Sequence, residues 1–170
     1  MEILGILLLV PLGAATIIAL FAALLLLIPT PIEKTRSILE NSLGRSLLLG
    51  VVNFIFFALL AMGFGWLAQN TGDLLSGIFI FLAAIILFGF AIFSILGLTA
   101  FANLFGERIG GGESPFASNL RGGTLLLLAG LAPYVGWFIF TPLVIWAGFG
   151  AAISALIQKR KKVSKIERND

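Results

Sequence analysis

The carboxylates are the first residues to test for chemistry, because acid–base pairs, proton relays and metal sites need them clustered or at depth. There are eight, and all lie in polar loops or near a chain end: Glu2, Glu33, Glu40, Asp73, Glu107, Glu113, Glu167 and Asp170. Cysteine and histidine are absent from the sequence, which removes thiolate chemistry and the commonest metal ligand and general base. A serine nucleophile would lack a base, so Ser94 and Ser154 are better explained as small packing residues. The sequence predicts no enzyme activity, metal or cofactor, and leaves a bound lipid or pigment open.

The composition indicates a membrane protein. Of 170 residues, 59% are hydrophobic and 11% charged, and the mean hydropathy is +1.11, unlike a soluble domain. We predict an all-α, polytopic integral membrane bundle with three spans and a C-terminal helical hairpin. Residues 1–158 would form a single membrane domain of four or five helices, followed by a basic tail at 159–170.

Three apolar stretches predict the spans, at residues 3–28, 46–68 and 74–104. The first follows Glu2 instead of a basic segment, so we interpret it as a retained span and not as a signal peptide. Between the first two spans, Thr30 as a cap with Pro31 and Glu33 predicts the start of a short helix at about 31–43. Its apolar residues share one face, which fits either an interfacial helix or a polar connector that touches the bundle: Ile32, Leu39 and Leu43.

The last apolar region is too long for one crossing. As a single helix, the uncharged residues 122–158 would extend about 55 Å, whereas a hydrocarbon core is about 30 Å thick. A turn is predicted at Pro133, Tyr134, Val135 and Gly136, because proline breaks the helix and glycine is free to take a positive φ. The arms would be helices at 115–132, with Ser114 as its cap, and 137–157. The first arm is short, so it either crosses fully or is re-entrant.

The basic residues decide the orientation. A hairpin at the end of the chain would place all eleven Lys and Arg on one side, which the positive-inside rule assigns to the cytoplasm. We therefore predict a multi-pass protein of the inner (cytoplasmic) membrane, with the C-terminal tail inside and the N-terminus outside. The tail should bind anionic lipid headgroups through Lys159, Arg160, Lys161 and Lys162, at about 1 kcal/mol each. A nucleic-acid partner is not expected.

Small residues within the apolar stretches predict where helices touch. The expected packing positions are Gly89, Gly97, Gly148, Gly150, Ala152 and Ser154. Asn53 is a strongly polar side chain at depth, and we expect it to bond a neighbouring helix rather than a substrate. The segment FGERIGGGE at 105–113 lacks the ending of a phosphate-binding loop and is predicted to be a flexible connection.

The segments FGERIGGGESPFASNLRGG, GLAPYVGWF and GFGAAI resemble a small multi-span module of uncharacterised bacterial membrane proteins. In some of those proteins the module accompanies bactofilin-like, polymer-forming segments. The similarity covers roughly residues 31–157. Its shared positions are Pro115, Gly122, Pro133, Gly136, Gly148, Gly150 and Ala151. The resemblance implies anchoring or scaffolding and assigns no catalytic residue.

The sequence is suited to helix packing and not to catalysis. We therefore expect a structural or accessory subunit that binds other membrane proteins or copies of itself. The alternative is a small transporter or channel for an uncharged or lipophilic solute, with Asn53, Thr99, Asn103 and the 133–136 turn lining the path. Catalysis on lipid headgroups ranks last, because no acid and base are matched.

Overall fold

The computed structural model describes the backbone of residues 2–110 and 114–166, and the side chains of Leu9, 11–110 and 114–157. Over this part of the chain every element is a helix. The elements are α1 (Glu2–Leu27), α2 (Pro29–Gln69), α3 (Asp73–Gly110), α4 (Pro115–Leu131), the π-helix η1 (Gly136–Phe140) and α5 (Thr141–Ile166). Three segments are long and apolar enough to cross a membrane: Pro29–Gln69, Asp73–Gly110 and Gly136–Ile157. The predicted all-α class is confirmed, and the predicted spans at 46–68 and 74–104 lie within two of these segments. The predicted span at 3–28 is not among them, since its described part, Pro11–Leu27, is a shorter apolar helix.

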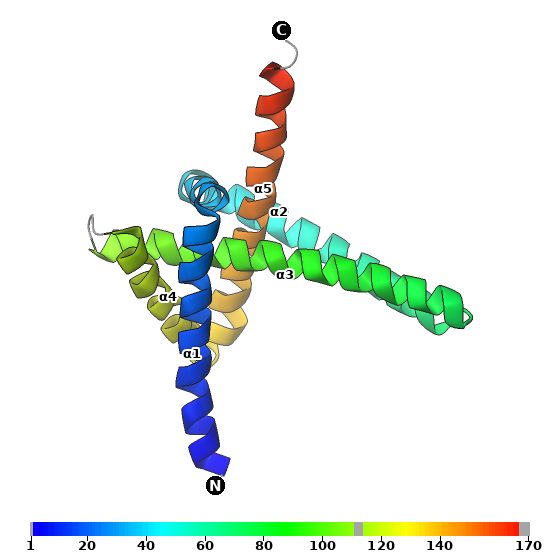
Figure 1. The fold of residues 1–170 in the computed structure, drawn as a ribbon, viewed down its shortest axis with the longest axis horizontal. Helices are drawn as coiled ribbons and strands as arrows, with labels where there is room; N and C mark the ends of the chain where they lie inside the picture. Colours follow the sequence, from blue (N-terminus) through cyan, green and yellow to red (C-terminus); the bar gives the residue numbers. More distant parts are fainter. Residues whose placement is uncertain (1, 111–113, 167–170) are drawn as a thin grey trace.

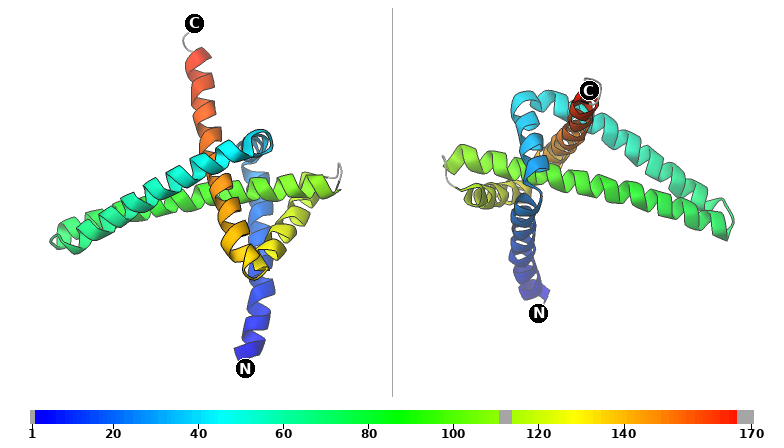
Figure 2. Two further views of the ribbon diagram at one scale, coloured as in Figure 1. Left: turned by 180° about the vertical axis from the view of Figure 1, so that it is seen from behind. Right: turned by 45° about the horizontal axis from the view of Figure 1, so that its top comes forward.

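Helices α2 and α3 form a long antiparallel hairpin that projects to one side of the molecule (Figure 1). We call its outer part, residues 52–69 and 73–92, the arm. Helices α1 and α5 lie across the hairpin, and the views in Figure 2 show the same crossing. The arm tip points to one side, whereas the N-terminal end of α1 and the turn between α4 and η1 both point toward the bottom of Figure 1. The helices are therefore splayed instead of lying side by side along one axis.

Helix α2 merges two predicted elements. It begins at Pro29, where the missing proline N–H costs nothing, and no side chain caps it, so the predicted cap at Thr30 is wrong. A kink at Ser42 (φ −151°, ψ 51°) separates the predicted short helix from the predicted span.

The first segment of α2 belongs to the protein core. Ile32 and Leu39 are buried, whereas Leu43 is 46% exposed beyond the kink. Two of the three predicted apolar residues thus pack against the other helices. Contact with the bundle is common to both predicted alternatives, the interfacial helix and the polar connector.

Helix α3 continues to Gly110, past the predicted end at residue 104. Residues 105–110 are therefore helical, and residues 111–113 of the predicted flexible segment lie outside the described residues. Gly106 lies in this helical extension and packs directly on α4, since a Cβ there would overlap the backbone carbonyl of Ser118. The glycine allows close packing of two helices and does not loosen the chain.

Helix α4 starts as expected, with the Ser114 hydroxyl accepting a hydrogen bond from the Ala117 N–H (3.3 Å). It ends where Ala132 turns extended (ψ 120°), because the residue before a proline is disfavoured in a helix. Both α4 and α5 pack on α3 and diverge from the turn as an open V (Figure 1).

The turn at 133–136 uses its residues differently from the prediction. The positive φ falls on Tyr134 (63°), not on Gly136, and the Val135 N–H donates to the Pro133 carbonyl (2.8 Å) to close a γ-turn. Gly136 is needed for space, because a Cβ there would overlap the Ala129 carbonyl.

Proline also explains the π-helix that follows the turn. Pro142 has no N–H to continue an α-helical ladder. The wider turn of η1 carries the hydrogen bond from the Thr141 N–H to the Gly136 carbonyl, five residues back. Pro142 lies in the first turn of α5, where a missing N–H is tolerated.

We predict opposite effects of two substitutions in this turn. Tyr134→Gly should raise the free energy of unfolding by about 0.5–1 kcal/mol, because glycine takes a positive φ without strain. Gly136→Ala should lower it by about 1–3 kcal/mol through overlap with the α4 backbone. Thermal unfolding in detergent measures both, and a lower midpoint for Tyr134→Gly would contradict the assigned turn geometry.

Candidate functional site

The closest helix contacts lie where α5 crosses α2 and α3. Gly97 of α3 faces Gly148 of α5, and a Cβ on Gly148 would lie 2.9 Å from the Gly97 carbonyl carbon. On the other side, Cβ atoms on Gly50 and Gly150 would overlap the backbone carbonyls of Trp146 and Ser46, respectively. Such contacts let helix backbones approach without intervening side chains. The predicted packing residues Gly97, Gly148 and Gly150 all lie at this crossing.

An aromatic cluster fills the angle between the crossing helices. Phe149 of α5 is fully buried, and its ring lies 4.8 Å from the ring of Phe90, between centroids. The rings of Phe57 and Phe93 both lie 6.2 Å away and meet it edge-on. These are favourable aromatic geometries, so the cluster stabilises α5 against both helices of the hairpin.

Several residues that are predicted to join two helices make different contacts in the structure. Gly89 lies on the arm, with nothing within 4 Å of a built Cβ, so it does not pack against another helix of the described chain. Asn53 donates to the Leu49 carbonyl (2.7 Å) of its own helix, not to a neighbouring helix as predicted. Ser154 likewise donates to the Gly150 carbonyl (2.8 Å) within α5, whereas Ala152 is buried. The side chains of the predicted headgroup-binding residues lie outside the described residues: Lys159, Arg160, Lys161 and Lys162.

The start of α2 is tied to the end of α3 by an ion pair. The Arg36 guanidinium binds both carboxylate oxygens of Glu107, and its Nη1 also donates to the Asn103 Oδ1 (3.2 Å). Bidentate pairing of this kind fixes geometry as well as adding energy. Sequence reasoning placed these residues in separate loops and missed the link.

Further basic residues lie on the segments that adjoin this ion pair in the chain and on the start of α4. The Arg121 guanidinium of α4 lies beside Gly110 at the end of α3. Arg45 of α2 lines a cavity with Ser154 and Ile157 of α5, directly before the tail. We call these segments, residues 29–46, 103–110 and 114–122, the basic root. The arm tip at 70–72 and the 132–135 turn lie away from it (Figure 1).

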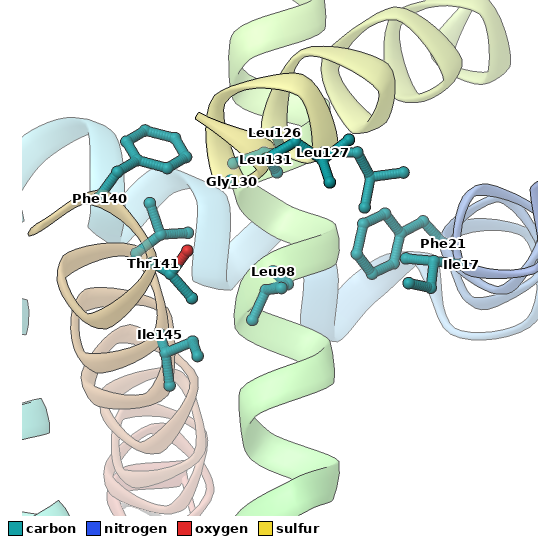
Figure 3. Close-up of a pocket in the computed structure, with 11 residues that line it drawn as sticks. Ile17, Phe21, Leu98, Leu126, Leu127, Gly130, Leu131, Phe140, Thr141 and Ile145 are labelled. Carbon is teal, nitrogen blue, oxygen red and sulfur yellow. The ribbon is translucent and has the colours of Figure 1, made fainter. Parts of the chain in front are cut away.

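An apolar cavity of about 250 Å³ lies between α1, α3, α4 and α5, near the apex of the V (Figure 3). It is lined by Ile17, Phe21, Leu98, Leu126, Leu127, Gly130, Leu131, Phe140, Thr141, Val144 and Ile145. Among the lining residues that the structure describes, Thr141 carries the single side-chain hydroxyl. A hydrocarbon chain fits such walls, and a charged ligand does not.

The residues of the predicted solute path do not meet at this cavity. Thr99 and Asn103 are buried, and the Thr99 hydroxyl donates to the Ile95 carbonyl (2.8 Å). Neither they nor Asn53 line the cavity.

A shallow apolar groove of about 450 Å³ runs along the α2 side of the arm. It is lined by Phe56, Leu59, Leu60, Gly63, Phe64 and Leu67. Nothing lies within 4 Å of a Cβ built on Gly63. Over residues 11–110 and 114–157, no other helix therefore fills this groove.

Comparisons with protein-family models, curated proteins and solved structures found no match to this chain. The resemblance to the bacterial multi-span module remains a prediction. Function must accordingly be argued from the surfaces and cavities described above.

We predict that the ion pair is a stabilising link. Arg36→Gln should lower the free energy of unfolding by about 1–3 kcal/mol, because Glu107 and Asn103 lose a charged donor. Arg36→Glu combined with Glu107→Arg should recover part of the loss, and Arg108→Gln, at an exposed neighbouring position, should have little effect. Additive losses in the exchanged pair, measured by thermal unfolding in detergent, would refute a direct link.

Proposed function

We propose that this chain is a non-enzymatic structural or accessory subunit of a membrane assembly. Its arm would pack against a partner membrane protein or a second copy of the chain. The observation that carries the proposal is the empty groove around Gly63 on the projecting arm.

The glycines distinguish surfaces that are already used from surfaces that are open. Gly50 and Gly97, at the crossing, touch the backbone of α5. Gly63, Gly65 and Gly77, on the arm, have nothing within 4 Å of a built Cβ. Small residues beside large apolar ones let a further helix approach closely within a membrane. Lipid can cover the rest of the arm. A groove with a glycine at its base can also accept the row of side chains that another helix presents.

The same proposal includes an orientation. The basic root and the start of the basic tail would face the cytoplasm, while the arm tip, the 132–135 turn and the N-terminus would face the other side. The grouping of Arg36, Arg45 and Arg121 supports it, because positive residues of short loops favour the cytoplasmic face. On this view the splayed helices cross the inner membrane at a tilt, and the 115–157 region crosses it twice.

Site-specific photocrosslinking in native membranes tests the proposed surface. A photoreactive residue at Leu59, in the groove, should give a discrete protein adduct. The matched position is Leu128 on α4, which is also exposed but lies outside the arm, and it should give only lipid adducts. Equal protein adducts at both positions, or none at Leu59, would count against the arm as the docking surface.

A second candidate function rests on the apolar cavity near the π-helix. A lipophilic solute fits its walls, and π-helical turns often occur at functional sites. Solute flux into liposomes that contain only this protein, lost in Gly130→Leu, would favour transport. A Cβ at Gly130 meets the Thr141 hydroxyl at 3.6 Å, so a larger side chain would extend into the cavity.

A further inference from the structure

A cavity of about 330 Å³ between α2 and α5 differs in character from the apolar cavity. Its lining consists of Ile38, Ser42, Arg45, Ser46, Leu49, Ser154 and Ile157. Three hydroxyl groups and one guanidinium therefore share an otherwise aliphatic pocket. Arg45 is its single charged residue among those described, and no lining residue is a carboxylate. The pocket thus has the chemistry to receive an anion.

The kink in α2 adds positive potential at the same place. Ser42 has angles (φ −151°, ψ 51°) that do not continue an α-helix, so a new helical segment starts after it. The N-terminal end of a helix carries partial positive charge and presents backbone N–H groups. Arg45 and Ser46, which line the pocket, lie in the first turn of this segment.

Ser46 contributes a buried hydroxyl to the lining of the pocket. Its side chain is 1% exposed, and its hydroxyl has no hydrogen-bond partner among the described residues. The other lining hydroxyls are engaged, since Ser42 donates to the Ile38 carbonyl (3.0 Å) and Ser154 to the Gly150 carbonyl (2.8 Å). Buried polar groups are normally hydrogen-bonded, so an unpaired hydroxyl beside a cavity calls for a partner.

The pocket lies where two helices change from apolar to basic. In α2, the charged segment 29–45 gives way to the apolar stretch 46–68 at Arg45 and Ser46. In α5, the apolar stretch ends at Ile157, and the basic tail starts at Lys159. Both transitions mark the depth at which an apolar helix meets lipid headgroups.

We propose that this pocket binds the phosphate group of a phospholipid headgroup. The Arg45 guanidinium would donate two hydrogen bonds to phosphate oxygens, and the Ser46 hydroxyl would donate a third. Leu49 and Ile157 would contact the first carbons of the lipid chains. The site is distinct from the tail lysines and does not depend on what binds the arm.

Lipid titration of the delipidated full-length protein, followed by intact-mass measurement in detergent, tests the proposal. Phosphatidylglycerol should bind at least about tenfold more tightly than diacylglycerol with the same chains, because only the former carries the phosphate. Arg45→Gln should weaken phosphatidylglycerol binding about tenfold, as expected for a lost charge-assisted hydrogen bond, and Ser46→Ala about threefold.

Matched variants control for charge and for a lost hydroxyl. Arg108→Gln removes an exposed basic residue of α3, and Ser94→Ala removes another buried hydroxyl without a partner, outside the pocket. Both should leave phosphatidylglycerol binding unchanged. The basic tail is present in every variant, so its contribution cancels in the comparison. Unchanged thermal unfolding of Ser46→Ala shows that a weaker affinity is not a loss of fold.

The outcomes separate the possible sources of phosphate. Equal affinity for diacylglycerol and phosphatidylglycerol, or binding unaffected by Arg45→Gln and Ser46→Ala, would overturn the proposal. If inorganic phosphate binds with the same dependence on Arg45 and Ser46 while phosphatidylglycerol does not, the pocket recognises free phosphate and the lipid assignment is wrong. Competition of both ligands for one site would support phosphate recognition by these residues.

Discussion

Replacing Gly97 by leucine is expected to destabilise the protein severely. A Cβ at this position would overlap the backbone of Gly148, and backbone atoms cannot rotate away as a side chain can. Overpacking a tight contact lowers the free energy of unfolding by about 1–3 kcal/mol. For a leucine placed against a helix backbone, we expect a loss at or above the upper end of this range. For a chain of this size, a loss of about 3 kcal/mol lowers the unfolding midpoint by roughly 6–12 °C.

Gly89→Leu is the matched control for this effect. Gly89 lies on the same helix, also within its apolar part, but nothing lies within 4 Å of a Cβ there. This substitution should be neutral or slightly stabilising, because leucine forms helices better than glycine by about 0.5–1 kcal/mol. Similar unfolding midpoints for the two variants in detergent would show that α5 does not cross α3 at Gly97.

Filling the groove on the arm is expected to release the partner without unfolding the subunit. Gly63→Leu would place a side chain where a partner helix has to approach. We expect the yield of the Leu59 photocrosslink to fall at least about tenfold, which corresponds to a loss of about 1.4 kcal/mol in binding. The unfolding midpoint of the subunit should stay within the range of a surface substitution.

Gly65→Leu controls for the changes that any leucine would cause on α2. Gly65 is also a glycine with open space around it, but it does not line the groove. The Leu59 crosslink should persist in this variant. Equal losses in Gly63→Leu and Gly65→Leu would indicate a general effect on the arm, and no loss in either would remove the groove from the interface.

Much of the helical architecture follows from composition and from breaks in the apolar pattern. The polar segment 69–73 and the proline at 133 mark where the chain reverses, and Ser114 with Pro115 marks a helix start. These features are local, because a proline without an N–H or a capping hydroxyl acts within one helical turn.

The contacts between helices could not be predicted in the same way. Gly89 and Gly97 look equivalent in the sequence, and only the path of α5 distinguishes a packed glycine from an open one. Gly106 suggested a loose loop, although its lack of a side chain serves the contact with α4. One missed contact did leave a signal, since the spacing of Ser46 and Gly50 is the small-xxx-small pattern. The link from Arg36 to Glu107 left none, because it depends on the return of α3 to the start of α2.

The mass of the intact particle, purified from native membranes in a mild detergent, tests the central claim most directly. Our account predicts a particle that contains a partner membrane protein or a second copy in fixed ratio to this chain. That component should remain with Gly65→Leu and be lost from Gly63→Leu. A monomer of unchanged mass in the wild type and in both variants would contradict a subunit that acts through its arm.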